Sequence, residues 1–306
     1  IENNLVVESV PYKIHDIHSK YTGKNLLENP SKDDFSSDGF NENIDVYYGN
    51  VSLLLHGDDL TDSGVGNYPI TNNNVTVDTS VKKFGSGSLY FNGSNTVLYT
   101  LDPLQGQSSG GFYFAFDPYT IDMWINPTAN NLDQTILDLG QTNVTSAFAI
   151  AMNSTGNLII ASDRSTSGQT VDYTSTSVIP INEWTHIAIC KTGNFGGAVR
   201  VYINGVQDGA TLLTEFDNRF IISGYLRPIF GLGGFTSASD YFTGYMDEIR
   251  FTKGVSRFGT VSSFQTELNP FGNADYGVVN DETKIFEALA TYTPQLFADG
   301  TLGFDL

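Results

Sequence analysis

The stretch that decides the fold runs from Gly244 to Phe258 and reads GYMDEIRFTKGVSRF. Tyr245, Ile249 and Phe251 share one parity, which is typical of a strand that buries one face, because side chains alternate between the two faces of a strand. Met246 and Phe258 break this alternation. The pattern alone therefore predicts a strand followed by a polar turn.

Five stretches upstream also have sequences typical of a strand followed by a turn. They are Val51–Asp58 with Asp62–Gly64, Phe84–Gly93, Tyr119–Ile125, Glu183–Ile189 and Val199–Gly205. Together with residues 244–258, and in the same order, they resemble the strands of laminin-G-like, concanavalin A-type jelly-roll domains. The resemblance covers roughly residues 50–260. It implies an all-β fold, an antiparallel jelly-roll sandwich of two sheets.

Composition agrees with a β-rich domain. The chain has 31 Gly, 16 Tyr and 21 Phe, and only 16% of its residues are charged. Many short strands separated by polar turns, with no long helical period, are typical of a sandwich or barrel. The expected strands are 51–56, 87–92, 95–101, 119–126, 134–139, 146–153, 157–162, 169–174, 184–192, 198–204, 219–222, 228–232 and 243–252. We expect the two sheets to bury Trp124, Trp184, Ile121, Ile187 and Ile249 between them.

The sequence predicts three regions. Residues 1–48 are charged and rich in turn residues, and are interpreted as an N-terminal arm. Residues 49–268 form the predicted laminin-G-like sandwich. Residues 269–306 form a C-terminal extension, in which Asp281 can cap a short helix with Ile285, Phe286 and Leu289 on one face.

The charge balance limits the partners. Lys and Arg total 15 against 34 Asp and Glu, which gives a net charge of −19. Nucleic acid is excluded as a partner, because its binding depends on basic side chains that displace counterions. The acidity favours solubility, with divalent-cation binding or a salty habitat as the alternative. No apolar run is long enough to cross a membrane, and the residues after Ile1 do not have the pattern of a secretion signal.

Cys190 is the chain's one cysteine, so no internal disulfide can form. Its apolar neighbours predict a core residue and not a nucleophile. The absence of disulfides favours a bacterial or viral relative of the family.

We expect no enzyme activity. A sandwich glycosidase needs paired carboxylates on one face of a strand, on either side of the glycosidic bond. Glu215 and Asp217 have the nearest spacing but lack a third acidic residue, and the adjacent Asp247 and Glu248 are expected to point to opposite faces of their strand. The four histidines have no metal-binding spacing outside the arm, and no nucleophile elbow is present.

Calcium binding is the main cofactor hypothesis. Asp58, Asp59 and Asp62 cluster after the first expected strand, and calcium takes six to eight oxygen ligands. The resemblance implies that Asp58 and Asp247 supply side-chain ligands while backbone carbonyls complete the shell. The alternative is that Asp62 begins a turn and bonds its own backbone.

The resemblance also implies recognition of glycans or proteins through edge loops or the concave face. A sugar site combines a flat aromatic ring with amides or carboxylates. The candidates in or beside polar loops are Tyr173, Tyr225 and Tyr241, with Asn153, Asp163 and Asp172 near them in sequence. The alternative is that each tyrosine merely covers a sheet surface.

The sequence of residues 245–258 resembles that of the last strand in laminin-G-like domains of phage and marine bacterial structural proteins. This resemblance implies a virion component, either a fibre or a capsid decoration protein, that forms a homo-oligomer. The terminal arms would contact other virion or surface proteins, and the sandwich would contact host glycans. The alternatives are an adhesin module at an extracellular or cell-surface location, a decoration protein without a ligand, and a glycoside hydrolase.

Overall fold

The chain divides into two units, residues 45–273 and residues 1–44 with 274–306. The computed structural model describes residues 45, 47–100, 110–112, 114, 117–130, 132–140, 148–165, 168–193, 197–209, 227–233, 240–267, 269–272, 293–296 and 302–305. Of these, residues 140, 162–165, 168–172, 227, 233, 293–296 and 302–305 are described by their backbone alone. In the second unit it describes one hairpin, β18 (Thr293–Leu296) with β19 (Leu302–Asp305). The predicted N-terminal arm up to residue 44, the helix after Asp281 and the strand at 219–222 lie outside the described residues. No helix in the described ranges is long and apolar enough to span a membrane.

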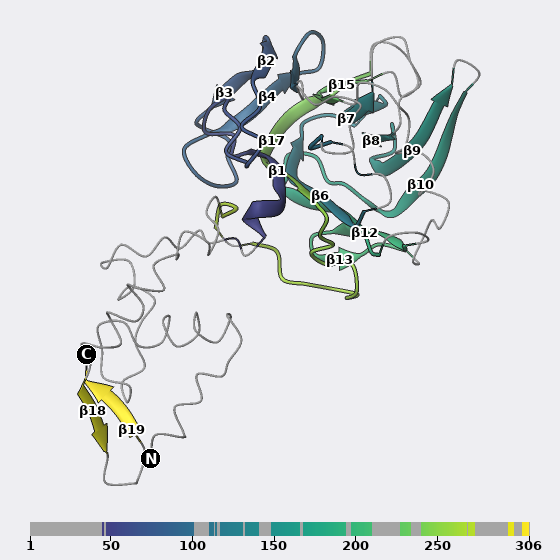
Figure 1. The fold of residues 1–306 in the computed structure, drawn as a ribbon. Helices are drawn as coiled ribbons and strands as arrows, with labels where there is room; N and C mark the ends of the chain where they lie inside the picture. The colour runs from purple at the N-terminus through teal and green to yellow at the C-terminus, as the bar shows by residue number, and fades with distance from the viewer. Residues whose placement is uncertain are drawn as a thin grey trace. The chain divides into compact units, whose positions relative to one another are not determined.

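The first unit is a sandwich of two sheets, as predicted (Figure 1). The strands of the first sheet are β1 (Val51–Leu55), β3 (Thr76–Asp78), β4 (Ser88–Asn92), β6 (Tyr119–Pro127), β11 (Thr185–Lys191), β12 (Val199–Ile203), β13 (Val206–Gln207) and β17 (Thr243–Lys253). This eight-stranded sheet has the order β13-β12-β11-β6-β17-β4-β3, and β1 also pairs with β17. The decisive stretch of sequence therefore forms a central strand.

The second sheet has nine strands. They are β2 (Ile70–Asn73), β5 (Val97–Thr100), β7 (Gln134–Gly140), β8 (Phe148–Met152), β9 (Asn157–Ser165), β10 (Gly168–Val178), β14 (Arg227–Phe230), β15 (Leu232–Gly233) and β16 (Asp240–Tyr241). The order is β10-β9-β8-β7-β14-β5-β2, and β16 pairs with β15 and, in parallel, with β7. The sequence did not predict β2, β3, β13 and β16, because strands of two to four residues are too short to show a period.

Apolar side chains fill the space between the sheets. Ile121, Met123 and Ile125 of β6 alternate toward this core, where they meet Ile187 of β11 and Ile249 of β17. All five side chains are fully buried. Burial of Ile121, Ile187 and Ile249 between the sheets is therefore confirmed.

The predicted position of the tryptophans is wrong. Trp124 alternates with Met123 and Ile125 along β6, so it lies on the outer face of the eight-stranded sheet. There it packs with Val51, Leu54 and Phe271 in a second cluster, and the half-buried Trp184 joins this cluster.

A β-bulge in β17 explains why the sequence pattern was irregular. Asp247 pairs with Trp124 of β6 whereas Arg250 pairs with Asp122, so β17 carries one extra residue between these pairs. Glu248 has a φ of 49° at this point. Because the extra residue shifts the alternation, Met246 before the bulge and Ile249 after it both face the core.

The bulge also corrects the prediction that Asp247 and Glu248 point to opposite faces. Asp247 lies opposite the outer residue Trp124. Glu248 accepts hydrogen bonds from His56 and from the backbone N–H of Phe271, which belongs to the outer cluster. Both carboxylates are therefore on the outer face.

Arg250 joins the two ends of this unit. Its guanidinium bonds the Asp122 carboxylate at 2.7 and 3.1 Å and Asp45 at 3.4 Å, and it stacks on the Phe271 ring, 3.7 Å from the centroid. Arg257 bonds the same Asp45 carboxylate at 2.6 and 2.9 Å. Arg250 in β17 and Arg257 in the turn after it therefore hold Asp45, and Arg250 also holds Phe271 near the other end of the unit.

Candidate functional site

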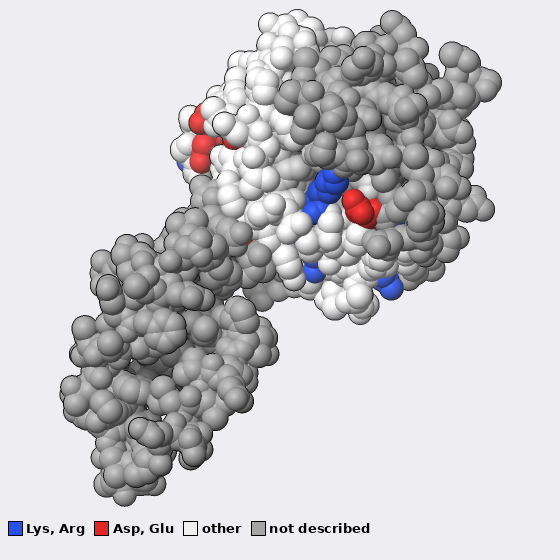
Figure 2. All heavy atoms as spheres, viewed as in Figure 1, with Lys and Arg blue, Asp and Glu red and all other residues white. Residues whose placement is uncertain are grey.

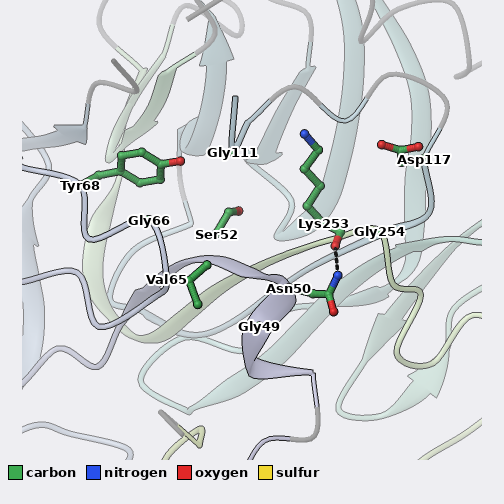
Figure 3. A pocket seen from close by; sticks show the side chains of 10 residues that line it. All are labelled: Gly49, Asn50, Ser52, Val65, Gly66, Tyr68, Gly111, Asp117, Lys253 and Gly254. Carbon is green, nitrogen blue, oxygen red and sulfur yellow. Dashed lines mark hydrogen bonds between the residues drawn. The ribbon is translucent and has the colours of Figure 1, made fainter. Parts of the chain in front are cut away.

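An open cavity of about 430 Å³ lies where the short 3₁₀ helix η2 (Tyr48–Asn50) leads into β1, beside the end of β17 (Figure 3). Its walls come from segments far apart in the chain. The lining residues are Gly49, Asn50, Ser52, Val65, Gly66, Tyr68, Gly111, Asp117, Lys253 and Gly254. A pocket of this size is large enough for a small ligand. We call it the Tyr68 pocket.

Tyr68 forms one wall of the pocket, and Figure 3 shows its hydroxyl pointing across toward Gly111. The ring packs against Phe112 at 4.9 Å between centroids. A Cβ on Gly66 would lie 2.1 Å from this ring, and one on Gly111 would lie 2.1 Å from its hydroxyl. The two glycines thus allow the ring to sit tightly against the backbone.

Polar groups lie on the other side of the pocket. The Asn50 amide donates to the Lys253 carbonyl at 3.0 Å, which leaves its own carbonyl oxygen for other donors. The Lys253 ammonium donates to the Gly110 carbonyl at 2.7 Å. The exposed Asp117 also lines the pocket, and in the view of Figure 3 Lys253 lies between it and Tyr68. An aromatic ring facing amide, ammonium and carboxylate groups suits a ligand with hydroxyls around an apolar ring.

Of the ten residues that line the pocket, Asp117 and Lys253 are charged. On the face viewed in Figure 2, the described basic and acidic groups are few and separate, and they form no large patch of one sign. Recognition here would therefore depend on hydrogen bonds and ring contacts more than on a charged patch.

The structure places Tyr173 away from the surface. Its ring belongs to the main core and is 7% exposed, and its hydroxyl donates to the Asp208 carbonyl at 2.9 Å and contacts the Asp208 carboxylate. Burial and this carboxylate raise the pKa of Tyr173 well above its usual range. Tyr173 therefore does not offer a ring face to a sugar, because the core covers it.

The other predicted binding residues do not gather with Tyr173. Tyr241 is half-buried on β16, which is not a neighbour of β9 or β10 in the sheet. Asp163 and Asp172 lie on β9 and β10, but their side chains, like the whole of Tyr225, lie outside the described residues. Asn153 uses its side-chain oxygen within its own turn, on the N–H groups of residues 155 and 157.

Sequence reasoning missed the Tyr68 pocket. The available signal was an aromatic residue in a glycine-rich loop, Gly64-Val65-Gly66-Asn67-Tyr68. Such loops are common in a sandwich. The other lining residues come from three separate segments, near residue 50, at 111–117 and at 253–254, so the pocket exists only in the folded chain.

Two of the predicted calcium ligands keep a carboxylate oxygen available. Asp58 Oδ1 accepts the backbone N–H groups of Ser86 and Gly87, at 2.5 and 3.0 Å. Asp247 Oδ2 accepts those of residues 83 and 84, while its Oδ1 is buried without a partner. Burial raises the pKa of Asp247 to about 7. A buried oxygen without a donor is a suitable ligand for a cation.

The other two predicted ligands serve turns. Asp59 accepts the backbone N–H of Thr61 at 2.8 Å. Asp62 accepts three backbone N–H groups, including that of Gly64 two residues on. The structure thus follows the turn alternative for Asp62. Within the described ranges, no three His, Cys, Asp or Glu side chains converge as a metal site, so calcium binding would depend on backbone carbonyls.

The described residues offer little for catalysis. The side chains of Asp247 and Glu248 are 0% and 1% exposed. Cys190 is buried beside Ala188 and Tyr202, and burial raises the pKa of its thiol to about 12. Glu215 and Asp217 lie outside the described residues. None of the described acidic or thiol groups considered for catalysis therefore reaches solvent.

One known protein family matches the central part of this chain. Residues 105–256 match the family described as the concanavalin A-like lectin/glucanases superfamily, in its laminin-G-like form. The chain contains a laminin-G-like domain. The family description covers both lectins and glucanases, so it does not separate binding from catalysis. No curated protein matches the chain.

Solved structures are similar to the laminin-G-like domain in fold. Domain 4 of AbnA, a GH43 extracellular arabinanase from Geobacillus stearothermophilus, solved with arabinotriose, is 21% identical with a TM-score of 0.45, over 68% of this chain and 94% of that chain. The binding domain of botulinum neurotoxin serotype D/C is 16% identical with a TM-score of 0.51, over 70% of this chain and 51% of that chain. The match thus spans about half of that binding-domain chain. At 16% identity it establishes the fold alone.

Proposed function

We propose that this chain is a non-catalytic binding protein whose laminin-G-like domain holds a sugar in the Tyr68 pocket. The observation that carries the proposal is the placement of the Tyr68 ring opposite Asn50, Asp117 and Lys253. The ring suits the apolar face of a sugar, and the polar groups suit its hydroxyls. Burial of the Asp247 and Glu248 carboxylates favours binding over hydrolysis.

An uncharged sugar fits the pocket better than an acidic one. The net charge of −19 disfavours the approach of sialylated or sulfated glycans. Asp117 adds a carboxylate to the wall, and the Lys253 ammonium already donates to the Gly110 carbonyl. The expected ligand is therefore a neutral oligosaccharide.

The first prediction is that the full chain binds neutral oligosaccharides on a glycan array and that Tyr68→Ala removes this binding. Loss of a stacking ring from a small site should weaken affinity by tenfold or more, on the order of 1.5 kcal/mol. Tyr90→Ala is the matched control, since Tyr90 pairs with Tyr245 away from the pocket. Equal binding by the wild type and Tyr68→Ala, or a loss with Tyr90→Ala alone, would contradict this site.

Calcium binding stays a proposal, with Asp58 and Asp247 as the side-chain ligands. The unpartnered Asp247 Oδ1 supports it. The second prediction is that chelation with EDTA lowers the melting temperature of the wild type but not that of Asp247→Asn, because a bound ion stabilises only the folded state. If the wild type has the same melting temperature with EDTA as with added calcium, the calcium proposal is overturned.

A virion location, oligomer formation and contacts through the terminal arms also stay proposals. Their support is the resemblance of residues 245–258 to phage structural proteins. A bacterial surface adhesin remains the alternative. Electron microscopy of particles carrying the chain, with antibody labelling, would decide between the two, since an adhesin would label cell surfaces.

A further inference from the structure

We infer that Asp62 is the positioning residue of the Tyr68 pocket, and that its buried carboxylate holds residues 62–68 so that the Tyr68 ring is fixed before a ligand arrives. This rests on the proposed function for the identity of the ligand. The positioning role itself rests on contacts within the domain.

The Asp62 carboxylate gathers three parts of the chain. Its Oδ1 accepts the N–H of Leu54 in β1 at 2.9 Å and that of Gly64 at 2.8 Å. Its Oδ2 accepts the N–H of Tyr68 at 2.8 Å. Asp62 is 7% exposed, so these bonds are shielded from water. A single side chain thus ties a strand, a turn and the aromatic wall of the pocket together.

The rest of the loop lies along β1. The N–H of Ser63 donates to the Leu54 carbonyl at 2.8 Å, and that of Val65 donates to the Val51 carbonyl at 2.9 Å. A Cβ on Gly64 would lie 3.0 Å from the Asp62 carboxylate and from the backbone of β1. A side chain at this position would therefore push the loop and the strand a few tenths of an ångström apart.

The chain then folds back so that the Tyr68 ring covers Gly66. The backbone turns at Asn67, which has a φ of 43°. The ring enters the slot between Gly66 and Gly111 and packs on Phe112. Asp62 fixes the backbone of Tyr68 and the slot fixes its ring, so both ends of the residue are constrained. A constrained aromatic group loses little conformational freedom when a ligand binds.

An ionised carboxylate suits this role because its two oxygens are acceptors only. Asparagine has nearly the same shape, but its amide nitrogen cannot accept. Asp62→Asn would therefore leave at least one buried N–H, on Tyr68 or on the turn, without a partner. Asp59 provides the matched control, because it lies in the same loop, is exposed, and accepts from Thr61 alone.

The experiment uses the full chain and has two readouts. The first is hydrogen exchange of the backbone amides of residues 62–68, measured by mass spectrometry without ligand. Asp62→Asn should speed exchange there while strands β6 and β11 stay protected, and Asp59→Asn should match the wild type. The second is affinity at 25 °C for the strongest-binding neutral oligosaccharide of the array. It should fall on the order of tenfold in Asp62→Asn and change by no more than about twofold in Asp59→Asn.

A second variant tests whether the effect passes through Tyr68. Gly111→Ala displaces the Tyr68 hydroxyl without touching Asp62. If both substitutions act by freeing the same ring, the double variant should have about the same affinity as the single variant with the lower affinity. Additive losses, or exchange and affinity in Asp62→Asn equal to those of Asp59→Asn, would overturn the inference. If the wild type binds no oligosaccharide, the proposed function fails, while hydrogen exchange still tests the positioning role.

Discussion

Three buried aspartates of the laminin-G-like domain have different partners, and these partners set their chemistry. Burial alone would raise the pKa of Asp122, but the Arg250 guanidinium and His186 lower it well below its usual range. Burial raises the pKa of Asp62, and three backbone N–H groups offset part of this rise. Asp247 has an oxygen without a partner. Among 34 acidic residues, the sequence has no local mark for Asp122 or Asp247, because their partners come from distant segments. Asp62 differs, since its three backbone partners lie within eight residues of it.

The third prediction concerns Asp122→Asn. Because the folded-state pKa of Asp122 is lowered, its ionised form stabilises the fold above about pH 4, and this contribution is lost as the pH falls further. The substitution also leaves the buried Arg250 with a weaker partner, so it should lower the free energy of unfolding by about 3 kcal/mol at pH 7. The difference in unfolding free energy from the wild type should shrink at pH 3, with Asp59→Asn as an exposed control. A difference independent of pH, measured by urea unfolding, would contradict the lowered pKa.

At the scale of elements, β17 shows both what the sequence could predict and what it could not. Residues 243–252 were expected as a strand, and the strand is Thr243–Lys253. Its faces were not predicted, because the bulge at Glu248 changes which parity is buried. A simple period of two therefore placed Tyr245 with Ile249 and Phe251, although Tyr245 lies opposite Tyr90 outside the core. In β6, which has no bulge, a period of two separates Trp124 from Ile121, and the prediction that both lie between the sheets was wrong because it ignored this alternation.

The fourth prediction is that deleting Glu248 prevents folding, whereas Glu248→Gly does not. The deletion removes the extra residue, so either Met246 or Ile249 must leave the core. The glycine variant keeps the residue count and suits a φ of 49°. It loses the bonds to His56 and Phe271, at a cost of about 1–3 kcal/mol. Circular dichroism during heating should show a cooperative transition for Glu248→Gly and none for the deletion. A cooperative deletion variant would argue against the role of the bulge.

At the scale of the whole molecule, the two-sheet architecture followed from the sequence because the family-like strands occur in order. The binding pocket did not, because its walls meet only after folding. The sandwich also reaches beyond the predicted limits of 49 and 268. Asp45 and Phe271 both contact Arg250, so residues on either side of the predicted limits belong to the packed unit.

The fifth prediction follows from this wider limit. A fragment of residues 45–273 should unfold cooperatively, and a fragment of residues 49–268 should be less stable by about 3 kcal/mol or more. The shorter fragment leaves Arg250 without Asp45 and without the Phe271 ring, and a buried charge that loses a partner is costly. Urea unfolding of both fragments measures the difference. Equal midpoints would show that the predicted limits were sufficient.

Arg250 also determines how the sandwich would respond to mechanical load. A pull applied through the chain before Asp45 and after Phe271 would act on the same guanidinium from both directions. The ion pairs and the stacked ring would therefore rupture before tension reached the inter-sheet core. A tethered form of this protein would be loaded first at the contacts of Asp45 and Phe271 with Arg250, Arg257 and Glu248.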